Sequence, residues 1–257
     1  MKRLWNSFKI AMAMYSKIPV PQSDWNKENM RYAMCFFPAV GVVIGVLTWL
    51  WGNFAGHWVG NTLYYVILVL IPVFVTGGIH LDGLLDTADA LSSYQERERK
   101  LEILKDSHAG AFAIIVGITY FLLYYGVYSE VSLRLLPIVC IGFVLSRTLS
   151  AYGIAKFPMA KNTGLAHTFS DGAQKQTVRK TCIVLAVLCL AAMCLVNLAA
   201  GLVCFASALA VFGWYYHMSM KQFGGITGDL AGFFLQICEL VMTASIVLVQ
   251  IVQAVIR

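Results

Sequence analysis

Three aspartates, Asp82, Asp86 and Asp89, are spaced i, i+4 and i+7 along the chain. On an α-helix this spacing places all three carboxylates on one face. Carboxylates this close repel one another, and one or more would take up a proton unless a cation compensated the charge. Ligand sets made only of oxygen suit Mg²⁺, Ca²⁺ or Mn²⁺ better than zinc. The spacing therefore predicts a divalent metal site held by Asp82, Asp86 and Asp89, for which we expect Mg²⁺.

The surroundings of the aspartates help to choose between interpretations. The intervening and flanking residues are largely apolar, which favours a position at a membrane boundary: Leu81, Leu84, Leu85 and Leu91. Carboxylates at that depth are costly and tend to be functional, which argues against a merely solvated helix face. A proton or cation pathway in a small transporter is the other alternative. Such a transporter would require acids near the midplane of several spans. Here Glu239 and Arg147 are the only charged residues that approach that depth.

The composition predicts the kind of scaffold that positions these residues. The chain of 257 residues is 59% hydrophobic and 12% charged, and soluble domains carry about 25% charged residues. A membrane-spanning helix needs roughly 20 mostly apolar residues. Suitable runs occur at 36–54, 62–79, 111–129, 135 onward past Arg147, 182–218 (two spans) and 240–256. We therefore expect an all-α polytopic membrane helical bundle of about seven transmembrane helices, forming a single integral membrane domain over residues 1–257.

The N-terminal residues predict a short amphipathic helix ahead of the first span. One helical face carries Leu4, Phe8, Ala11, Met12 and Tyr15, and the opposite face carries Lys2, Asn6, Lys9 and Ala13. Pro19 and Pro21 would end this helix. Such a helix is expected to lie at the cytoplasmic membrane surface, where cationic side chains meet anionic lipids.

The distribution of lysine and arginine predicts the orientation in the lipid bilayer. Residues 55–61, 130–134 and 197–201 contain one cation, Arg134, whereas the alternate loops are rich in lysine and arginine. The positive-inside rule then makes the N-terminus cytoplasmic. All the acids except Glu130 fall on the same side, so we expect the active site there. No basic-aromatic pattern indicates nucleic acid, and the sequence leaves a homo-oligomer open.

Other charged positions near span ends are candidates for phosphate contacts. Lys105 and Asp106 precede a glycine-led helix start at Gly110, and the free N–H groups of such a start are a natural phosphate site. Lys161 lies in a loop with proline and glycine. Arg147, about two turns inside a span, requires either an acidic partner or a substrate phosphate.

The sequence alone leaves open the roles of one further residue and one further segment. His80 is either a substrate contact or a boundary histidine, and on a continuous helix it would point away from the three acids. The segment Thr227-Gly228-Asp229 is a glycine-rich turn with one carboxylate that could complete a metal site.

These segments together resemble one known family. The resemblance is carried by Gly77-Gly78-Ile79-His80-Leu81-Asp82-Gly83-Leu84-Leu85-Asp86-Thr87-Ala88-Asp89, with Lys17-Ile18-Pro19-Val20-Pro21, Leu104-Lys105-Asp106-Ser107 and Thr227-Gly228-Asp229 with Glu239. The chain is similar over nearly its whole length to cobalamin synthases, the adenosylcobinamide-GDP ribazoletransferases. It departs from the family pattern at Ala90, where glycine is expected, and at Lys17 and His108, where arginine is expected.

The resemblance implies a reaction and a set of roles. The donor would be adenosylcobinamide-GDP and the acceptor α-ribazole or its 5′-phosphate, with attack by the ribose 3′-hydroxyl and release of GMP. Asp82, Asp86 and Asp89 would act at the metal, with Asp229 and Asp106 as further ligands or the base. The substrate-binding residues would be His80, Lys105, Arg147, Lys161, Thr227 and Gly228. The protein would lie in the bacterial inner membrane.

A CDP-alcohol phosphotransferase is the nearest enzymatic alternative. Those enzymes also use clustered aspartates at a membrane helix end to displace a nucleoside monophosphate. Their pattern places Ala-Arg after the first Asp-Gly, whereas Asp82-Gly83 is followed here by Asp86-Thr87. This alternative is therefore secondary.

Overall fold

The computed structural model describes residues 2–106, 108–161 and 164–256, so Ser107 of the family-like segment lies outside the described residues. In these ranges the chain is helical, with one isolated β-bridge. The helices are α1 (Lys2–Tyr15), α2 (Lys27–Met30), α3 (Ala33–Phe54), η1 (Ala55–His57), α4 (Asn61–Thr76), α5 (Ile79–Ser92), α6 (Arg97–Ile103), α7 (Ala111–Glu130), α8 (Leu136–Lys156), α9 (Leu165–Gly172), α10 (Lys175–Val196), α11 (Leu198–Phe223) and α12 (Gly228–Ile256). The all-α prediction is confirmed.

Six described helices are long and apolar enough to cross a membrane: α3 extended by η1, α7, α8, α10, α11 and α12. Helices α4 and α5 meet this criterion only as a pair, and they are bent by 96°. At the bend, Gly77 and Gly78 have φ of +64° and +81°, a backbone region that glycine enters without steric cost. The prediction of about seven spans is thus confirmed, and the bend separates the aspartate segment from the second span.

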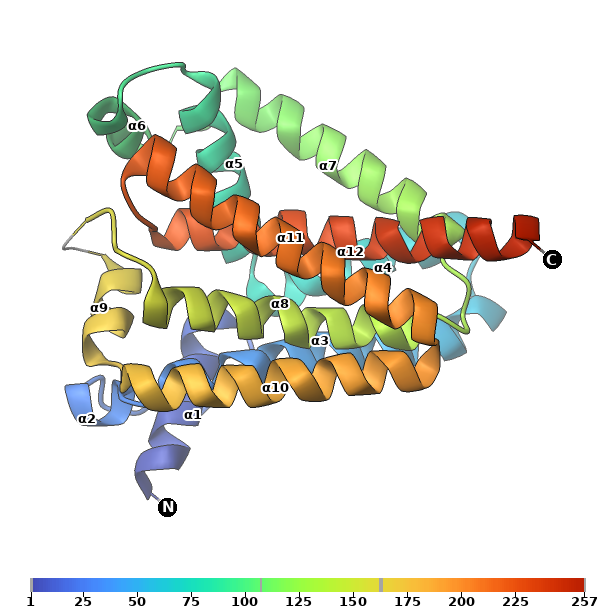
Figure 1. Cartoon of the computed structure of the whole chain (residues 1–257), viewed down its shortest axis with the longest axis horizontal. Helices are drawn as coiled ribbons and strands as arrows, with labels where there is room; N and C mark the ends of the chain where they lie inside the picture. Colours follow the sequence, from blue (N-terminus) through green and yellow to red (C-terminus); the bar gives the residue numbers. More distant parts are fainter. Residues whose placement is uncertain (1, 107, 162–163, 257) are drawn as a thin grey trace.

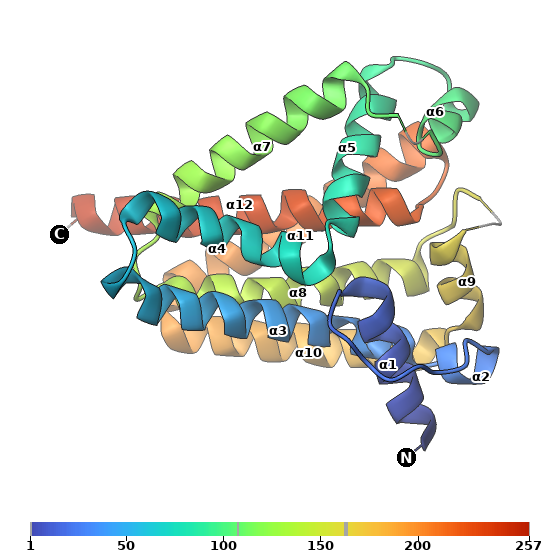
Figure 2. The same cartoon turned by 180° about the vertical axis from the view of Figure 1, so that it is seen from behind.

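The long helices run roughly along one direction, and α5 lies across them near one end of the bundle (Figures 1 and 2). Helices α1, α2, α6 and α9 gather at that same end, while the C-terminus lies at the opposite end. Helix α5, which carries the aspartates, therefore does not run along the bundle with the long apolar helices. Large apolar side chains are exposed along the outer helices, for example Ile114, Leu122 and Leu188. An apolar exterior of this extent is the surface expected of a protein in lipid.

Helix α1 forms as predicted and packs against α3. Its buried residues are Ser7, Ile10, Ala11 and Met12, while Leu4 is exposed. The face that contacts the protein is therefore rotated from the predicted apolar face. Tyr15, the last residue of α1, reaches the cavity described below.

Helices α5 and α12 touch through glycine. A Cβ atom at Gly83 would lie 2.5 Å from the Asp229 carbonyl oxygen, and one at Gly232 would lie 3.0 Å from the His80 carbonyl oxygen. A Cβ atom essentially never comes as close as at Gly83, and the approach at Gly232 would be unusually tight, so glycine at these positions permits direct contact of the two backbones. The crossing brings Asp229, at the start of α12, beside the aspartate helix.

Candidate active site

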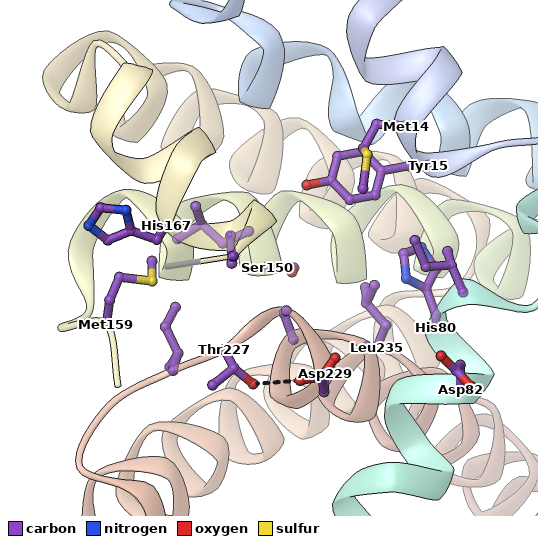
Figure 3. A pocket seen from close by; sticks show the side chains of 18 of the residues that line it. Met14, Tyr15, His80, Asp82, Ser150, Met159, His167, Thr227, Asp229 and Leu235 are labelled. Atoms are coloured by element: carbon purple, nitrogen blue, oxygen red, sulfur yellow. Dashed lines mark hydrogen bonds between the residues drawn. The ribbon is translucent and has the colours of Figure 1, made fainter. Parts of the chain in front are cut away.

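A cavity of about 260 Å³ lies at the end of the bundle where α5 crosses (Figure 3). Helices α1, α3, α5, α8, α9 and α12 contribute to its walls, together with the loops after α6 and α8. Its polar lining residues are His80, Asp82, Lys105, Ser150, Lys161, His167, Thr227 and Asp229, and Gly228 also lines it. The fold therefore gathers into one cavity residues that are far apart in the sequence.

Two carboxylates face this cavity from different helices. Asp82 comes from the first turn of α5 and Asp229 from the first turn of α12. The Thr227 hydroxyl donates to Asp229 Oδ2 at 3.3 Å and accepts from the Leu230 backbone N–H at 3.2 Å. Thr227 thus orients Asp229 while it satisfies a free N–H at the helix start. Among the described residues, neither carboxylate has an ion-pair partner.

Asp86, one turn further along α5, is surrounded by other acids. Burial, followed by the charges of Asp82, Asp229 and Asp89, raises the pKa of Asp86 to about 7. A bound cation would relieve this repulsion. Within the described ranges, no three acidic, histidine or cysteine side chains are grouped closely enough to hold a metal ion by themselves. Mg²⁺ is commonly held by one or two carboxylates together with substrate phosphates, so the donor atoms fit that ion.

Two lysines bring positive charge to the same cavity. Lys161 Nζ donates to the Leu101 carbonyl oxygen at 2.6 Å, which ties the loop after α8 to α6. Burial, and then the charge of Lys105, lowers the pKa of Lys161. Two neighbouring cations together with two carboxylates suit a phosphorylated ligand that arrives with a divalent metal.

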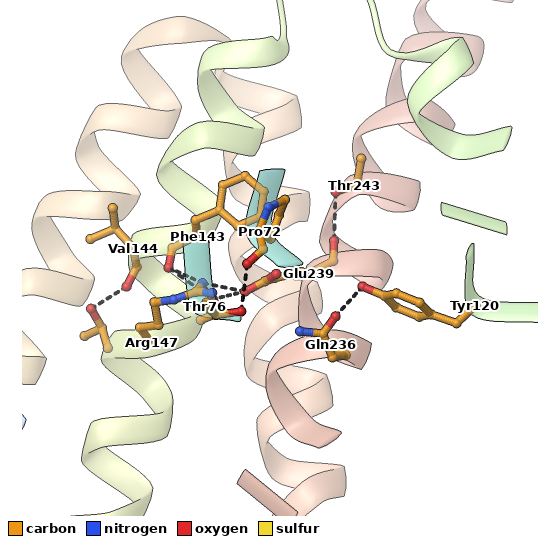
Figure 4. Close-up of polar contacts among 11 residues, drawn as sticks. Pro72, Thr76, Tyr120, Phe143, Val144, Arg147, Gln236, Glu239 and Thr243 are labelled. Carbon is orange, nitrogen blue, oxygen red and sulfur yellow. Dashed lines mark hydrogen bonds and ion pairs between the residues drawn. The ribbon is translucent and has the colours of Figure 1, made fainter. Parts of the chain in front are cut away.

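Arg147 does not line the cavity. It is fully buried in α8, where its Nη1 donates to Glu239 Oε1 at 2.5 Å and to the Phe143 carbonyl oxygen at 3.0 Å (Figure 4). Ser146 donates to the same Glu239 oxygen at 2.9 Å. Of the two roles open from the sequence, the structure supplies the acidic partner, and the expected contact with substrate phosphate is not formed by this arrangement.

Asp106 also lies outside the cavity. Its side chain is exposed, and its Oδ1 is 2.7 Å from Nδ1 of the neighbouring His108. The hydrogen bond from His108 holds the pKa of Asp106 below its usual range. The arrangement therefore gives Asp106 a local contact in its loop and no approach to the cavity.

Asp89 forms a contact that the sequence did not reveal. Its Oδ2 accepts from the Gly110 backbone N–H at 2.6 Å, and its Oδ1 accepts from the Ala113 N–H at 2.9 Å. The first N–H groups of a helix lack partners within the helix and are stabilised by an acceptor. Asp89 thus caps α7, and it occupies the helix start that the sequence predicted as a phosphate site.

The comparisons with known proteins decide the family. The sequence model described as cobalamin-5-phosphate synthase matches residues 7–247. The chain belongs to the cobalamin-5-phosphate synthase family. The resemblance seen in the aspartate segment is thereby confirmed over nearly the whole chain. No solved structure matches the chain.

Curated relatives match more than nine-tenths of the chain. A Lachnoclostridium phytofermentans protein is 45% identical over 95% of this chain and 94% of its own length. A Shewanella piezotolerans protein is 32% identical over 92% of both chains, and a Clostridium botulinum protein is 29% identical over 94% of this chain and 96% of its own. Each is named adenosylcobinamide-GDP ribazoletransferase.

Met14, Tyr15, Ser150 and His167 are among the residues lining the cavity that were not singled out for the site from the sequence. Tyr15 was predicted only as part of the apolar face of the first helix. Ser150 lies in an apolar span, where a serine resembles a packing residue. No periodicity or motif in the sequence separates them from their neighbours.

Replacing Asp89 by alanine tests whether this family member uses it as a cap or as a metal ligand. Loss of the cap is expected to cost about 1–2 kcal/mol of stability and to lower the melting temperature. The Mg²⁺ concentration for half-maximal activity should stay within about twofold of wild type, because the two Asp89 oxygens already accept backbone N–H groups. Gly110→Ala is a matched variant, because its Cβ would lie 2.7 Å from Asp89 Oδ1. A large shift in Mg²⁺ dependence for Asp89→Ala alone would restore the metal-ligand prediction.

Proposed function

We propose that this chain is an adenosylcobinamide-GDP ribazoletransferase, which releases GMP and forms adenosylcobalamin, or its 5′-phosphate when the acceptor is α-ribazole 5′-phosphate. The observation that carries the proposal is the cavity that joins Asp82 and Asp229 to Lys105 and Lys161. These residues supply opposite charges for a pyrophosphate and for a metal beside it. The names of the relatives identify the substrates that such a cavity would take.

The chain's own residues can be given roles in the transfer. Lys105 and Lys161 bind the pyrophosphate oxygens of the donor and neutralise charge that grows on the leaving GMP. The acceptor's 3′-oxygen forms a bond to the phosphorus next to cobinamide, and the bond from that phosphorus to the GMP oxygen breaks with its electron pair. Asp229, held by Thr227, takes the hydroxyl proton.

Asp82 and Asp86 are the residues that would hold Mg²⁺. The nearby Asp229 carboxylate would interact with the ion electrostatically. When bound, the ion would neutralise charge on the phosphate oxygens. The support for this role is the repulsion among the acids around Asp86 together with the oxygen-only donor set. Asp89 then acts by positioning, because it fixes α5 against the start of α7.

We further propose a multi-pass location in a bacterial inner membrane, as one integral membrane domain with the cavity on the cytoplasmic side. The N-terminus and the helices α2, α6 and α9 share the end of the bundle where α5 crosses. The connections at the other end, around residues 55–60, 131–135 and 197, carry only Arg134 as a cation. This asymmetry supports a cytoplasmic cavity.

The activity is tested with the protein in lipid vesicles, supplied with adenosylcobinamide-GDP, α-ribazole and Mg²⁺. We expect GMP and a new corrinoid product in equal amounts by chromatography, and loss of both after chelation of the metal. Restoring Mg²⁺ should recover the activity. Release that continues undiminished in chelator would remove the metal from the proposal, and no GMP with any divalent ion would overturn the proposed function.

A further inference from the structure

One end of the cavity is built from aromatic and apolar side chains. The ring centroids of Tyr15 and Phe37 are 4.3 Å apart, and the His80 ring lies 6.2 Å from Tyr15 and 5.8 Å from Phe37. The lining of the cavity also includes the apolar residues Met14, Ile79, Ile154 and Leu235. In Figure 3, Tyr15 lies across the cavity from Thr227 and Asp229. The cavity thus has an aromatic end and a charged end.

Two residues that line the cavity each carry a buried polar atom without a partner. His80 is 4% exposed and Ser150 is 2% exposed, and both line the cavity. Neither His80 Nε2 nor Ser150 Oγ has a hydrogen-bond partner among the described residues. Buried polar atoms are nearly always hydrogen-bonded, so these two are groups that a ligand would satisfy. A flat ring with a polar atom on its edge could stack on the aromatic wall and satisfy at least one of them.

We propose that Tyr15, Phe37, His80 and Ser150 form the pocket for the heteroaromatic base of the acceptor. This inference rests on the proposed function and assigns a part of the same cavity. The base of α-ribazole is a dimethylbenzimidazole, with an apolar edge and one unsubstituted ring nitrogen that accepts a hydrogen bond. Tyr15 and Phe37 contact its faces and edge, and His80 or Ser150 donates to the ring nitrogen.

The size of the cavity and the hydrogen-bonding capacity of its aromatic end suit the base of the acceptor better than the corrin ring or the guanine of the donor. Pockets for drug-sized ligands span about 300–1,000 Å³, so a cavity of about 260 Å³ is too small for a corrin ring. Guanine presents several donors and acceptors on one edge, whereas this end of the cavity offers two polar atoms among apolar side chains. A base at the aromatic end would also direct its ribose toward the charged end, where Asp82 and Asp229 lie.

The first arm of the test compares acceptors on the wild-type protein. The probes are α-ribazole and the matching dimethylindole riboside, in which a C–H replaces the unsubstituted ring nitrogen. We expect KM to be at least tenfold higher for the indole riboside. Equal KM values would overturn the hydrogen bond to the ring nitrogen.

The second arm uses variants and separates the two substrates. Stacking of a base on an aromatic side chain has a substantial effect, so Tyr15→Leu should raise KM for α-ribazole about tenfold and leave KM for adenosylcobinamide-GDP unchanged. His80→Phe and Ser150→Ala together should abolish the difference between the benzimidazole and indole ribosides. Tyr65→Leu, a half-buried tyrosine of α4 outside the cavity, is the matched control and should behave as wild type.

The outcomes separate this inference from the proposed function. A rise in KM for the donor alone would place guanine at the aromatic end, and unchanged KM values for both substrates would show that no base binds there. Either result would overturn the pocket while GMP release by the wild type continued. Absence of GMP release by the wild type would instead overturn the proposed function.

Discussion

Replacing Asp82 by asparagine is expected to lower the rate of GMP release about 1,000-fold, the scale of loss when one group that stabilises transition-state charge is removed. Asp82 lines the cavity, is exposed, and has no ion-pair partner among the described residues. Its removal should therefore leave the fold intact while it weakens metal binding. Product formation in vesicles is the measurement, and gel filtration of the purified protein checks folding.

Glu98→Gln is the matched control for Asp82→Asn. Glu98 is an exposed acid of α6 and does not line the cavity, so its loss should not change turnover. If the proposed metal site is correct, Asp82→Asn has a much lower turnover than Glu98→Gln. Wild-type activity of Asp82→Asn at low Mg²⁺ would contradict that site.

Replacing Glu239 by leucine is expected to destabilise the bundle by about 3–5 kcal/mol, because it leaves the buried Arg147 charge without a partner. Both side chains are essentially inaccessible, with 0% and 1% of their surfaces exposed. The single variant should be recovered in low yield and with a lower melting temperature in detergent. The double variant Arg147→Met with Glu239→Leu should regain most of that stability, because no charge remains buried.

The same pair of variants decides the role of Arg147. An active double variant would show that the ion pair only holds α8 against α12. A stable double variant without activity, and with a higher KM for adenosylcobinamide-GDP, would instead support the contact with substrate phosphate that the sequence predicted. Melting curves and steady-state kinetics on the wild type, Glu239→Leu and the double variant separate these results.

Much of the scaffold could be predicted because apolar runs of span length admit few structures in lipid. The aspartate helix was predicted from its i, i+4, i+7 spacing, and the structure adds the break at Gly77-Gly78 that precedes it. The direction of the break could not be predicted, because it depends on the contact between Gly83 and Asp229. Local spacing carries no information about that contact.

The sequence predicted which residues belong to the site better than it predicted how they are arranged. Lys105, Lys161 and Asp229 do reach the cavity with Asp82. Asp89 looked equivalent to Asp82 on the helix, yet it contacts the start of α7. Its partner is 21 residues away, and only tertiary packing distinguishes it from the other acids.

The glycine crossing of α5 and α12 has a consequence for biosynthesis of the protein. Asp82 is translated early, whereas Asp229 arrives with α12 and reaches the cavity only when the backbones of α5 and α12 cross at Gly83 and Gly232. A nascent chain that has inserted its first spans therefore carries half of the carboxylate pair and lacks the opposite wall. The carboxylate pair of the proposed site is therefore complete only after α12 has inserted, and a nascent chain stalled before that helix lacks Asp229.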